Sequence, residues 1–187
     1  GCYYFGQGVT QDYKQAIYWY TKSAEQGHSE AQFNLGVCYD NGQGVTQDYK
    51  QAFNWYKKAA VQGHSEAQFN LGQYYEYGQG VTQDYKQAVY WYKKSAEQGY
   101  VNAQNNLGNC YYFGDGVTQD YTKAFEWYKK SAEQGYVNAQ NNLGECYYYG
   151  QGVAKNHSLA KCWFTKAANQ GLEVAQNNLT KLHFDSD

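Results

Sequence analysis

The residues of this chain whose types and spacing could support catalysis are Ser158 and Lys161, within the string Ser-Leu-Ala-Lys. An S-x-x-K string supplies the nucleophilic serine and its neighbouring lysine in penicillin-recognising enzymes. The K-T-G and S-D-N strings that accompany it there are absent from this sequence. Ser158 also falls at an expected helix start, where serine is a common cap. We therefore expect no catalytic residue and no enzymatic activity, and a β-lactam-binding protein or hydrolase acting through Ser158 is an alternative.

Histidines and glycine-rich loops are the other candidates for chemistry. His28 and His64 occupy equivalent turns 36 positions apart. Ligands of one metal ion all lie about 2 Å from it, so we do not expect two histidines a full repeat apart to bind the same ion. The Gly-Gln-Gly loops lack the Gly-Lys-Ser/Thr ending of a phosphate-binding loop and are expected to join helix to helix. The sequence therefore predicts no metal site and no cofactor.

The composition restricts the class of protein and its partners. The 187 residues include 23 Tyr and 20 Gly but no Pro, Met or Arg, which is unusual for an ordinary mixed domain. A formal charge of −2 creates no strong field for nucleic acid or anionic lipid. No apolar run approaches the length that spans a bilayer. We expect no nucleic-acid partner, no membrane insertion and a monomeric chain.

A period of 36 residues governs the chain. A first helix is expected to begin with Ser29-Glu30-Ala31-Gln32 as a capping box and to end at Gly42 with a left-handed cap. A second helix is expected to begin at Asp48, whose carboxylate caps it, and to end before Gly63. Tryptophan recurs once per period, at Trp19, Trp55, Trp91, Trp127 and Trp163. Of these, Trp91 is expected to lie in the core.

The cysteines follow the same period. Cys2, Cys38, Cys110 and Cys146 share one repeat position, and equivalent positions in stacked helices lie about 8–10 Å or more apart, beyond the reach of a disulfide. We expect buried thiols at these positions. Cys162 lies on a second helix and could meet Cys146 only if both face the same side.

The repeated unit opens with Ala-Gln-x-Asn-Leu-Gly, turns at Gly-x-Gly-Val and contains Trp-Tyr, from Ala31 to Gly63 and again from Ala67 to Gly99. In these motifs it resembles the Sel-one-like repeat family, which is related to tetratricopeptide repeats. The resemblance covers essentially the whole chain. It implies an all-α fold, an α/α solenoid in which helix-turn-helix repeats form a right-handed superhelix with first helices inside.

The domain organisation follows from this register. We expect residues 1–187 to form one solenoid domain of about five repeats, with residues 1–6 as the tail of a truncated first helix. A helix over about 173–185 is expected to cap the array, because Thr180 replaces the glycine that follows leucine in the other units. The chain opens without Met in the tail of a helix, so we interpret it as a piece of a longer protein and assign no compartment.

The resemblance also implies an adaptor that binds a partner protein or an extended peptide in the groove lined by first helices. Of the 15 lysines only Lys181 lies on a first-type helix, which favours a basic or polar partner. Asparagine amides can donate to and accept from a peptide backbone. A carbohydrate-binding module that uses rim aromatics is an alternative. The side chains expected to line the groove are Phe33, Asp40, Phe69, Gln73, Glu76, Tyr77, Asn105, Asn109, Tyr112, Phe113, Asn141, Glu145, Tyr148 and Tyr149.

Overall fold

The computed structural model describes residues 2–6, 8 and 11–184, and these residues form eleven helices and no strand. The all-α prediction is confirmed. The helices are α1 (Cys2–Phe5), α2 (Tyr13–Glu25), α3 (Ser29–Asn41), α4 (Tyr49–Val61), α5 (Ser65–Tyr77), α6 (Tyr85–Glu97), α7 (Val101–Phe113), α8 (Tyr121–Glu133), α9 (Val137–Tyr149), α10 (His157–Asn169) and α11 (Glu173–Phe184).

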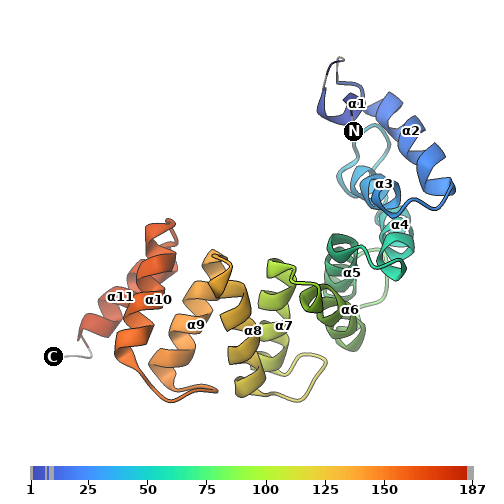
Figure 1. The fold of residues 1–187 in the computed structure, drawn as a ribbon. Coiled ribbons are helices and arrows are strands. Elements are labelled where there is room, and N and C mark those ends of the chain that lie inside the picture. The colour runs from blue at the N-terminus through green and yellow to red at the C-terminus, as the bar shows by residue number, and fades with distance from the viewer. Residues whose placement is uncertain (1, 7, 9–10, 185–187) are drawn as a thin grey trace. The chain divides into compact units, whose positions relative to one another are not determined.

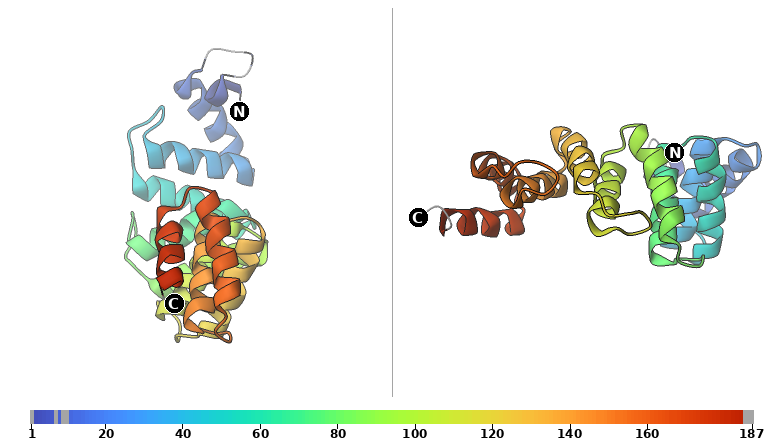
Figure 2. Two further views of the ribbon diagram at one scale, coloured as in Figure 1. Left: turned by 90° about the vertical axis from the view of Figure 1, so that its left-hand side faces the viewer. Right: turned by 90° about the horizontal axis from the view of Figure 1, so that it is seen from below.

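The helices belong to two compact units, Gly1–Gln98 and Gly99–Asp187. First helices (α1, α3, α5 in one unit and α7, α9, α11 in the other) alternate with second helices (α2, α4, α6 and α8, α10), as Figures 1 and 2 show. Within a unit, α3, α5 and α9 each pack against the second helix of their own repeat and against the preceding second helix. We call the side of a unit formed by its first helices the first-helix face, and the opposite side the second-helix face.

The helix ends are fixed by local hydrogen bonds. Asp48 Oδ1 accepts from the backbone N–H groups of Lys50 and Gln51 at 2.9 and 3.1 Å, which satisfies donors that the first turn leaves unpaired. Gly42 closes α3 with φ 68°, in the left-handed region that side chains disfavour. Both expected caps are confirmed.

The expected capping box at Ser29 is wrong. His28 is the N-cap of α3, and Gln32 is buried and donates to the carbonyl of Ala24, in the preceding second helix, at 3.1 Å. Gln62, at the end of the following second helix, donates to Gln32 Oε1 at 2.7 Å. The glutamine thus bonds to two neighbouring helices instead of its own N-terminus. The pairing recurs at Gln68–Gln98, Gln104–Gln134 and Gln140–Gln170.

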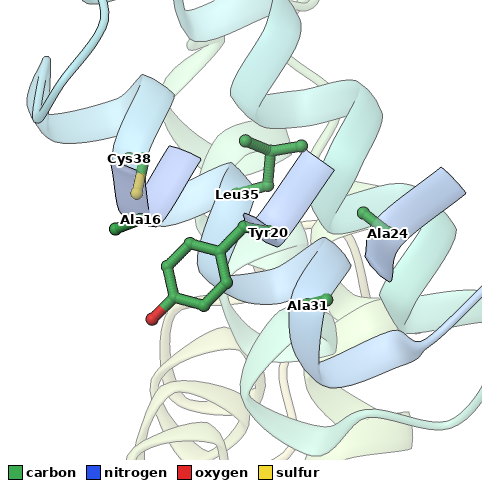
Figure 3. Packing of buried hydrophobic residues seen from close by; sticks show 6 residues of the cluster. All are labelled: Ala16, Tyr20, Ala24, Ala31, Leu35 and Cys38. Carbon is green, nitrogen blue, oxygen red and sulfur yellow. The ribbon is translucent and has the colours of Figure 1, made fainter. Parts of the chain in front are cut away.

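The core is made of small residues packed around large rings. In the first unit Ala16, Tyr20 and Ala24 of α2 face Ala31, Leu35 and Cys38 of α3 (Figure 3). Alanine side chains allow the helix axes to approach closely, and the tyrosine ring fills the remaining space. Trp91 is also buried, with Ala59, Ala60, Ala67 and Leu71, so its expected place in the core is confirmed.

The glycine of each Leu-Gly pair lies directly against a ring of the second helix. A Cβ added to Gly36 would lie 2.7 Å from Cδ1 of Tyr56, closer than nonbonded carbon atoms pack. The same contact joins Gly72 to Tyr92, Gly108 to Tyr128 and Gly144 to Phe164. These glycines are therefore required by the packing between helices.

Three described cysteines are buried and one is exposed. Cys38, Cys110 and Cys146 are buried, Cys162 is exposed, and all four are free, so Cys146 and Cys162 do not pair. Burial raises the pKa of the Cys38 thiol to about 11 and that of Cys146 to about 12. The expectation of buried thiols is confirmed for these three, and the side chain of Cys2 lies outside the described residues.

The C-terminal helix expected over about 173–185 is α11, and residues 185–187 lie outside the described part of the chain. Thr180, which stands where the other first helices have glycine, is exposed and donates to the carbonyl of Gln176 at 3.2 Å. None of the described helices is both long enough and apolar enough to cross a membrane.

The glycine–ring contact can be tested at Gly72. We expect Gly72→Ala to lower the free energy of unfolding by about 1–3 kcal/mol, because the added methyl group overpacks the site against Tyr92. In a Tyr92→Leu background the ring that the added methyl group would meet is absent. The same substitution should then cost much less, because the helix preference of alanine over glycine, about 1 kcal/mol, offsets the remaining loss. Urea denaturation of the four proteins measures both effects. An equal loss in both backgrounds would contradict the proposed contact.

Candidate functional site

Hollows recur on the first-helix face where two first helices meet over a ring of the second helix. Pocket A, in the first unit, has a volume of about 460 Å³ and is lined by Phe5, Trp19, Tyr20, Ser23, His28, Glu30, Ala31 and Asn34. Pocket B, in the second unit, has a volume of about 290 Å³ and is lined by Asn105, Asn109, Tyr112, Phe113, Tyr128, Asn138, Asn142 and Glu145. Pocket C has no room for a water molecule and is lined by Glu145, Tyr148, Tyr149, Phe164, Asn178 and Lys181.

Pocket B brings together five of the residues expected in the groove: Asn105, Asn109, Tyr112, Phe113 and Glu145. The buried ring of Tyr128 also lines it, and the Tyr128 hydroxyl donates to Asn109 Oδ1 at 2.8 Å. The ring of Phe113 lies at the rim and is 65% exposed. The pocket therefore combines an apolar ring surface with amide and carboxylate oxygens.

The asparagines of the second unit form hydrogen bonds between repeats. Asn105 and Asn141 are only 5% and 6% exposed. Asn142 donates to Asn105 Oδ1 at 3.0 Å, and one repeat later Asn178 donates to Asn141 Oδ1 at 2.9 Å. These bonds fasten each first helix to the next. The half-buried Asn142 also lines pocket B, although the sequence did not lead us to expect it in the groove.

Glu145 lies between pockets B and C. Its Oε1 accepts from Asn141 at 3.0 Å and from Asn178 at 3.2 Å. Its other oxygen, Oε2, has no partner among the described residues. The carboxylate is half-buried, so this oxygen presents negative charge to a partly desolvated pocket.

The acidic residues expected in the first-unit groove bind tyrosine hydroxyls of the core. Asp40 accepts from Tyr56 at 3.2 Å and from Tyr74 at 2.7 Å, and Glu76 accepts from the hydroxyl of Tyr92. Burial, with the Asp40 carboxylate in addition, raises the pKa of Tyr56 and Tyr74. These two carboxylates therefore satisfy polar groups at the edge of the core.

The remaining expected residues of the first unit divide between the core and the surface. Phe69 is buried beside Tyr92, with ring centroids 5.8 Å apart, while Phe33 and Gln73 are half-buried. Tyr77 is 64% exposed at the end of α5. In the second unit Tyr148 is buried and Tyr149, the last residue of α9, is 53% exposed.

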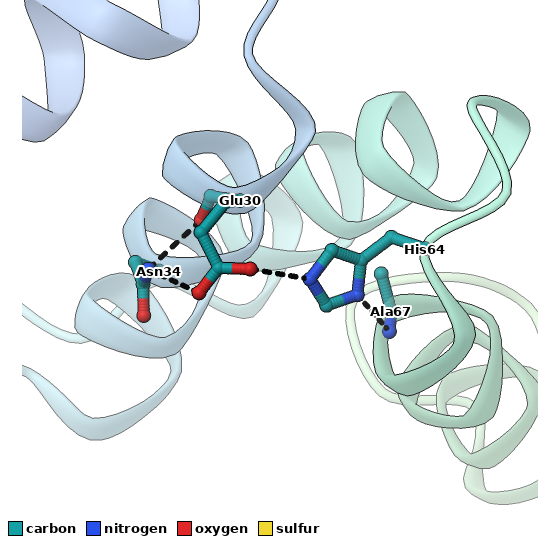
Figure 4. Close-up of polar contacts among 4 residues, drawn as sticks. All are labelled: Glu30, Asn34, His64 and Ala67. Carbon is teal, nitrogen blue, oxygen red and sulfur yellow. Dashed lines mark hydrogen bonds and ion pairs between the residues drawn. The ribbon is translucent and has the colours of Figure 1, made fainter. Parts of the chain in front are cut away.

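In pocket A the carboxylate of Glu30 already has partners (Figure 4). Asn34 donates to Glu30 Oε1 at 3.2 Å, and His64 Nε2 lies 3.1 Å from Glu30 Oε2. His64 Nδ1 accepts the backbone N–H of Ala67 at 3.3 Å, so the ring caps α5. The ring also stacks on Phe33, with centroids 4.6 Å apart. His28 makes no such side-chain cap, although the residues after both histidines are the same.

Ser158, the candidate nucleophile, is not the N-cap of its helix. Asn156 caps α10 by accepting from the N–H of Leu159 at 3.0 Å, so the expectation that Ser158 is the cap is wrong. Ser158 and Lys161 are both exposed on α10. No group of three His, Cys, Asp or Glu residues that could hold a metal ion occurs within the described chain.

Comparison with known proteins identifies relatives of the repeat and of the fold. The Sel1 repeat model matches residues 1–28, 29–64, 65–100, 101–136 and 137–172. No sequence among the curated proteins matches the chain. A protective antigen present in uropathogenic Escherichia coli strains, which displays an SLR fold, is 44% identical with a TM-score of 0.94, over 99% of this chain and 40% of the antigen. This chain therefore spans well under half of that protein.

Two further solved structures are similar. A Sel1 repeat protein from Oxalobacter formigenes is 36% identical with a TM-score of 0.88, over 95% of this chain and 71% of that one. Helicobacter pylori cysteine rich protein B is 27% identical with a TM-score of 0.57, over 71% of this chain and 96% of its own. The solenoid prediction is confirmed by these neighbours.

The cap at His64 gives a prediction with an internal control. We expect His64→Ala to lower the free energy of unfolding by about 1–2 kcal/mol, the usual cost of losing an N-cap side chain. His28→Ala, at the equivalent turn without a side-chain cap, should change stability by less than about 0.5 kcal/mol. Equal losses in urea denaturation would show that the bond to Ala67 contributes nothing specific.

Proposed function

Because the chain belongs to the Sel1 repeat family, we propose that it is a protein-interaction scaffold that binds a partner protein or an extended peptide on its first-helix face. Sel1 repeats form a non-catalytic type of scaffold that commonly serves protein–protein interaction. In this proposal the chain binds a basic or polar partner and catalyses no reaction.

The observation that carries the proposal is a set of exposed aromatic rings at one repeat position. Tyr77, Phe113 and Tyr149 end α5, α7 and α9 and are 64%, 65% and 53% exposed. Exposing a large apolar ring to water is unfavourable, and recurrence at the edge of one face marks that face for association. Aromatic rings also lose little rotamer entropy when a partner covers them.

The residues of the same face divide into those that hold the face together and those that are free to contact a partner. Asn105, Asn141, Asp40 and Glu76 bond to neighbouring helices or core hydroxyls. We assign these residues to support of the face, together with Phe33 and Phe69. The proposed contact residues are those with surface left to offer, which are Gln73, Tyr77, Asn109, Tyr112, Phe113, Glu145 and Tyr149. Tyr148 is buried and belongs to the supporting residues.

The proposal is tested by selecting binding peptides from a displayed random library and measuring their affinity for variants. Phe113→Ala and Tyr149→Ala should each weaken binding at least tenfold, which corresponds to about 1.4 kcal/mol. Tyr90→Ala removes an exposed ring from α6 on the second-helix face and should leave the affinity unchanged. Melting curves of all three variants verify that the fold is retained.

Two outcomes would contradict the scaffold proposal. Either no peptide is selected at all, or the selected peptides lose affinity with Tyr90→Ala and keep it with both first-helix variants. A glycan array run beside the library separates the carbohydrate alternative, since binding of a glycan that depends on Phe113 would assign the same face to a different ligand class.

A further inference from the structure

Pockets B and C are the same site, one repeat apart. Adding 36 to Asn109, Tyr112, Phe113, Tyr128, Asn142 and Glu145 of pocket B gives Glu145, Tyr148, Tyr149, Phe164, Asn178 and Lys181, which are the residues that line pocket C. The ring pairs have the same geometry, since Tyr112–Phe113 and Tyr148–Tyr149 are both edge-to-face with centroids 4.9 and 4.7 Å apart. Pocket C therefore shows what pocket B can accommodate.

A cation of the chain itself fills pocket C. Lys181 Nζ donates to the hydroxyl of Tyr149 at 3.0 Å and lies 5.3 Å from the ring centroids of both Tyr148 and Tyr149. At this distance the negative faces of aromatic rings attract an ammonium group. The ring pair and the cation together leave no room for water in pocket C.

Pocket B has the rings without the cation. The position of Lys181 is taken there by Glu145, and a volume of about 290 Å³ is open beside Tyr112 and Phe113. Glu145 is the one charged side chain among the lining residues of pocket B. Replacing a lysine by a carboxylate at this position leaves the ring pair open to a cation that comes from outside the chain.

Three of the open hydrogen-bonding groups of pocket B are acceptors, while the Oδ1 of Asn109 is already bonded to Tyr128 and Asn142 and leaves its amide N–H groups as donors. Asn142 uses its amide N–H groups to bond Asn105 and Asn109 at 3.0 and 3.5 Å, so its oxygen is the atom left for a ligand. Asn138 likewise donates to the hydroxyl of Tyr136 at 3.4 Å. Together with Glu145 Oε2, these oxygens match a ligand group that carries several N–H donors.

We propose that pocket B binds an arginine side chain of the partner, with the guanidinium against the Phe113 ring and its N–H groups directed at Glu145. This inference rests on the proposed scaffold function. A guanidinium is planar, stacks on aromatic faces and presents five donors, whereas an ammonium is a compact point charge. These 187 residues contain no arginine, so the guanidinium in this proposal comes from outside them.

The test uses N-acetyl-arginine methylamide as the probe and its citrulline analogue, which has the same shape but no charge, as the control. Nitrogen-15 spectra of the chain report on the side-chain amides of Asn109, Asn138 and Asn142. We expect saturable shifts of these amides with the arginine compound, and an affinity at least tenfold weaker for citrulline. The lysine analogue should bind more weakly than arginine, since it lacks the planar group.

Variants locate the site. Glu145→Gln should weaken arginine binding at least tenfold, and Phe113→Ala should weaken it severalfold. Glu126→Gln removes an exposed carboxylate from α8, on the second-helix face, and should have no effect. Because Glu145 also accepts from Asn141 and Asn178, the melting temperature of Glu145→Gln is measured too, and Phe113→Ala provides the independent test.

The arginine site is overturned if the amides of pocket B do not shift, if citrulline binds equally well, or if neither variant weakens binding. Failure of the scaffold proposal looks different, because it is the absence of any first-helix-dependent peptide in the library selection. Peptides that need Phe113 but contain no arginine would leave the scaffold standing and refute the arginine site.

Discussion

The close contact between a first-helix glycine and a second-helix ring is the constraint on which the other features depend. Since Gly36, Gly72, Gly108 and Gly144 have no Cβ, a tyrosine or phenylalanine ring lies directly on the backbone of the first helix. This contact sets how deeply the two helices of a repeat interpenetrate, and alanines on both sides extend it. The same contact in successive repeats places equivalent side chains at equivalent points of the first-helix face.

Polar groups then connect one repeat to the next without filling that face. The buried glutamines bond to the preceding and following second helices, and the asparagines of the second unit bond consecutive first helices. Each satisfies a donor or acceptor that would otherwise be costly to bury. A small set of positions remains free to differ between repeats. At one of them pocket C has Lys181 and is filled, whereas pocket B has Glu145 and is open.

Much of the fold could be predicted from the sequence because its determinants are local. The period, the Asp48 cap and the Gly42 cap each depend on residue type and spacing along the chain. The capping box was wrong because Gln32 finds its partners in neighbouring helices. A helix considered alone gives no indication of such partners.

The candidate site was less accessible from the sequence for a related reason. The spacing of a polar residue along the chain is the same whether its side chain faces solvent or the next helix. The burial of Asn105 and Asn141 therefore depends on the stacking of repeats. His28 and His64 have the same sequence after them, and only the stacking brings Glu30 to His64. The equivalence of pockets B and C does follow from the period, but the place of Lys181 over two rings required the structure.

The central claim is that ligands are bound on the first-helix face while the second-helix face solvates and supports the array. A crystal structure of the chain with a library-selected peptide tests it most directly. The account predicts that the peptide lies against α7 and α9 and buries the rings of Phe113 and Tyr149, which are exposed in the free chain. A peptide that instead lies along α8 and α10, over Trp127 and Trp163, and leaves those two rings exposed would contradict it.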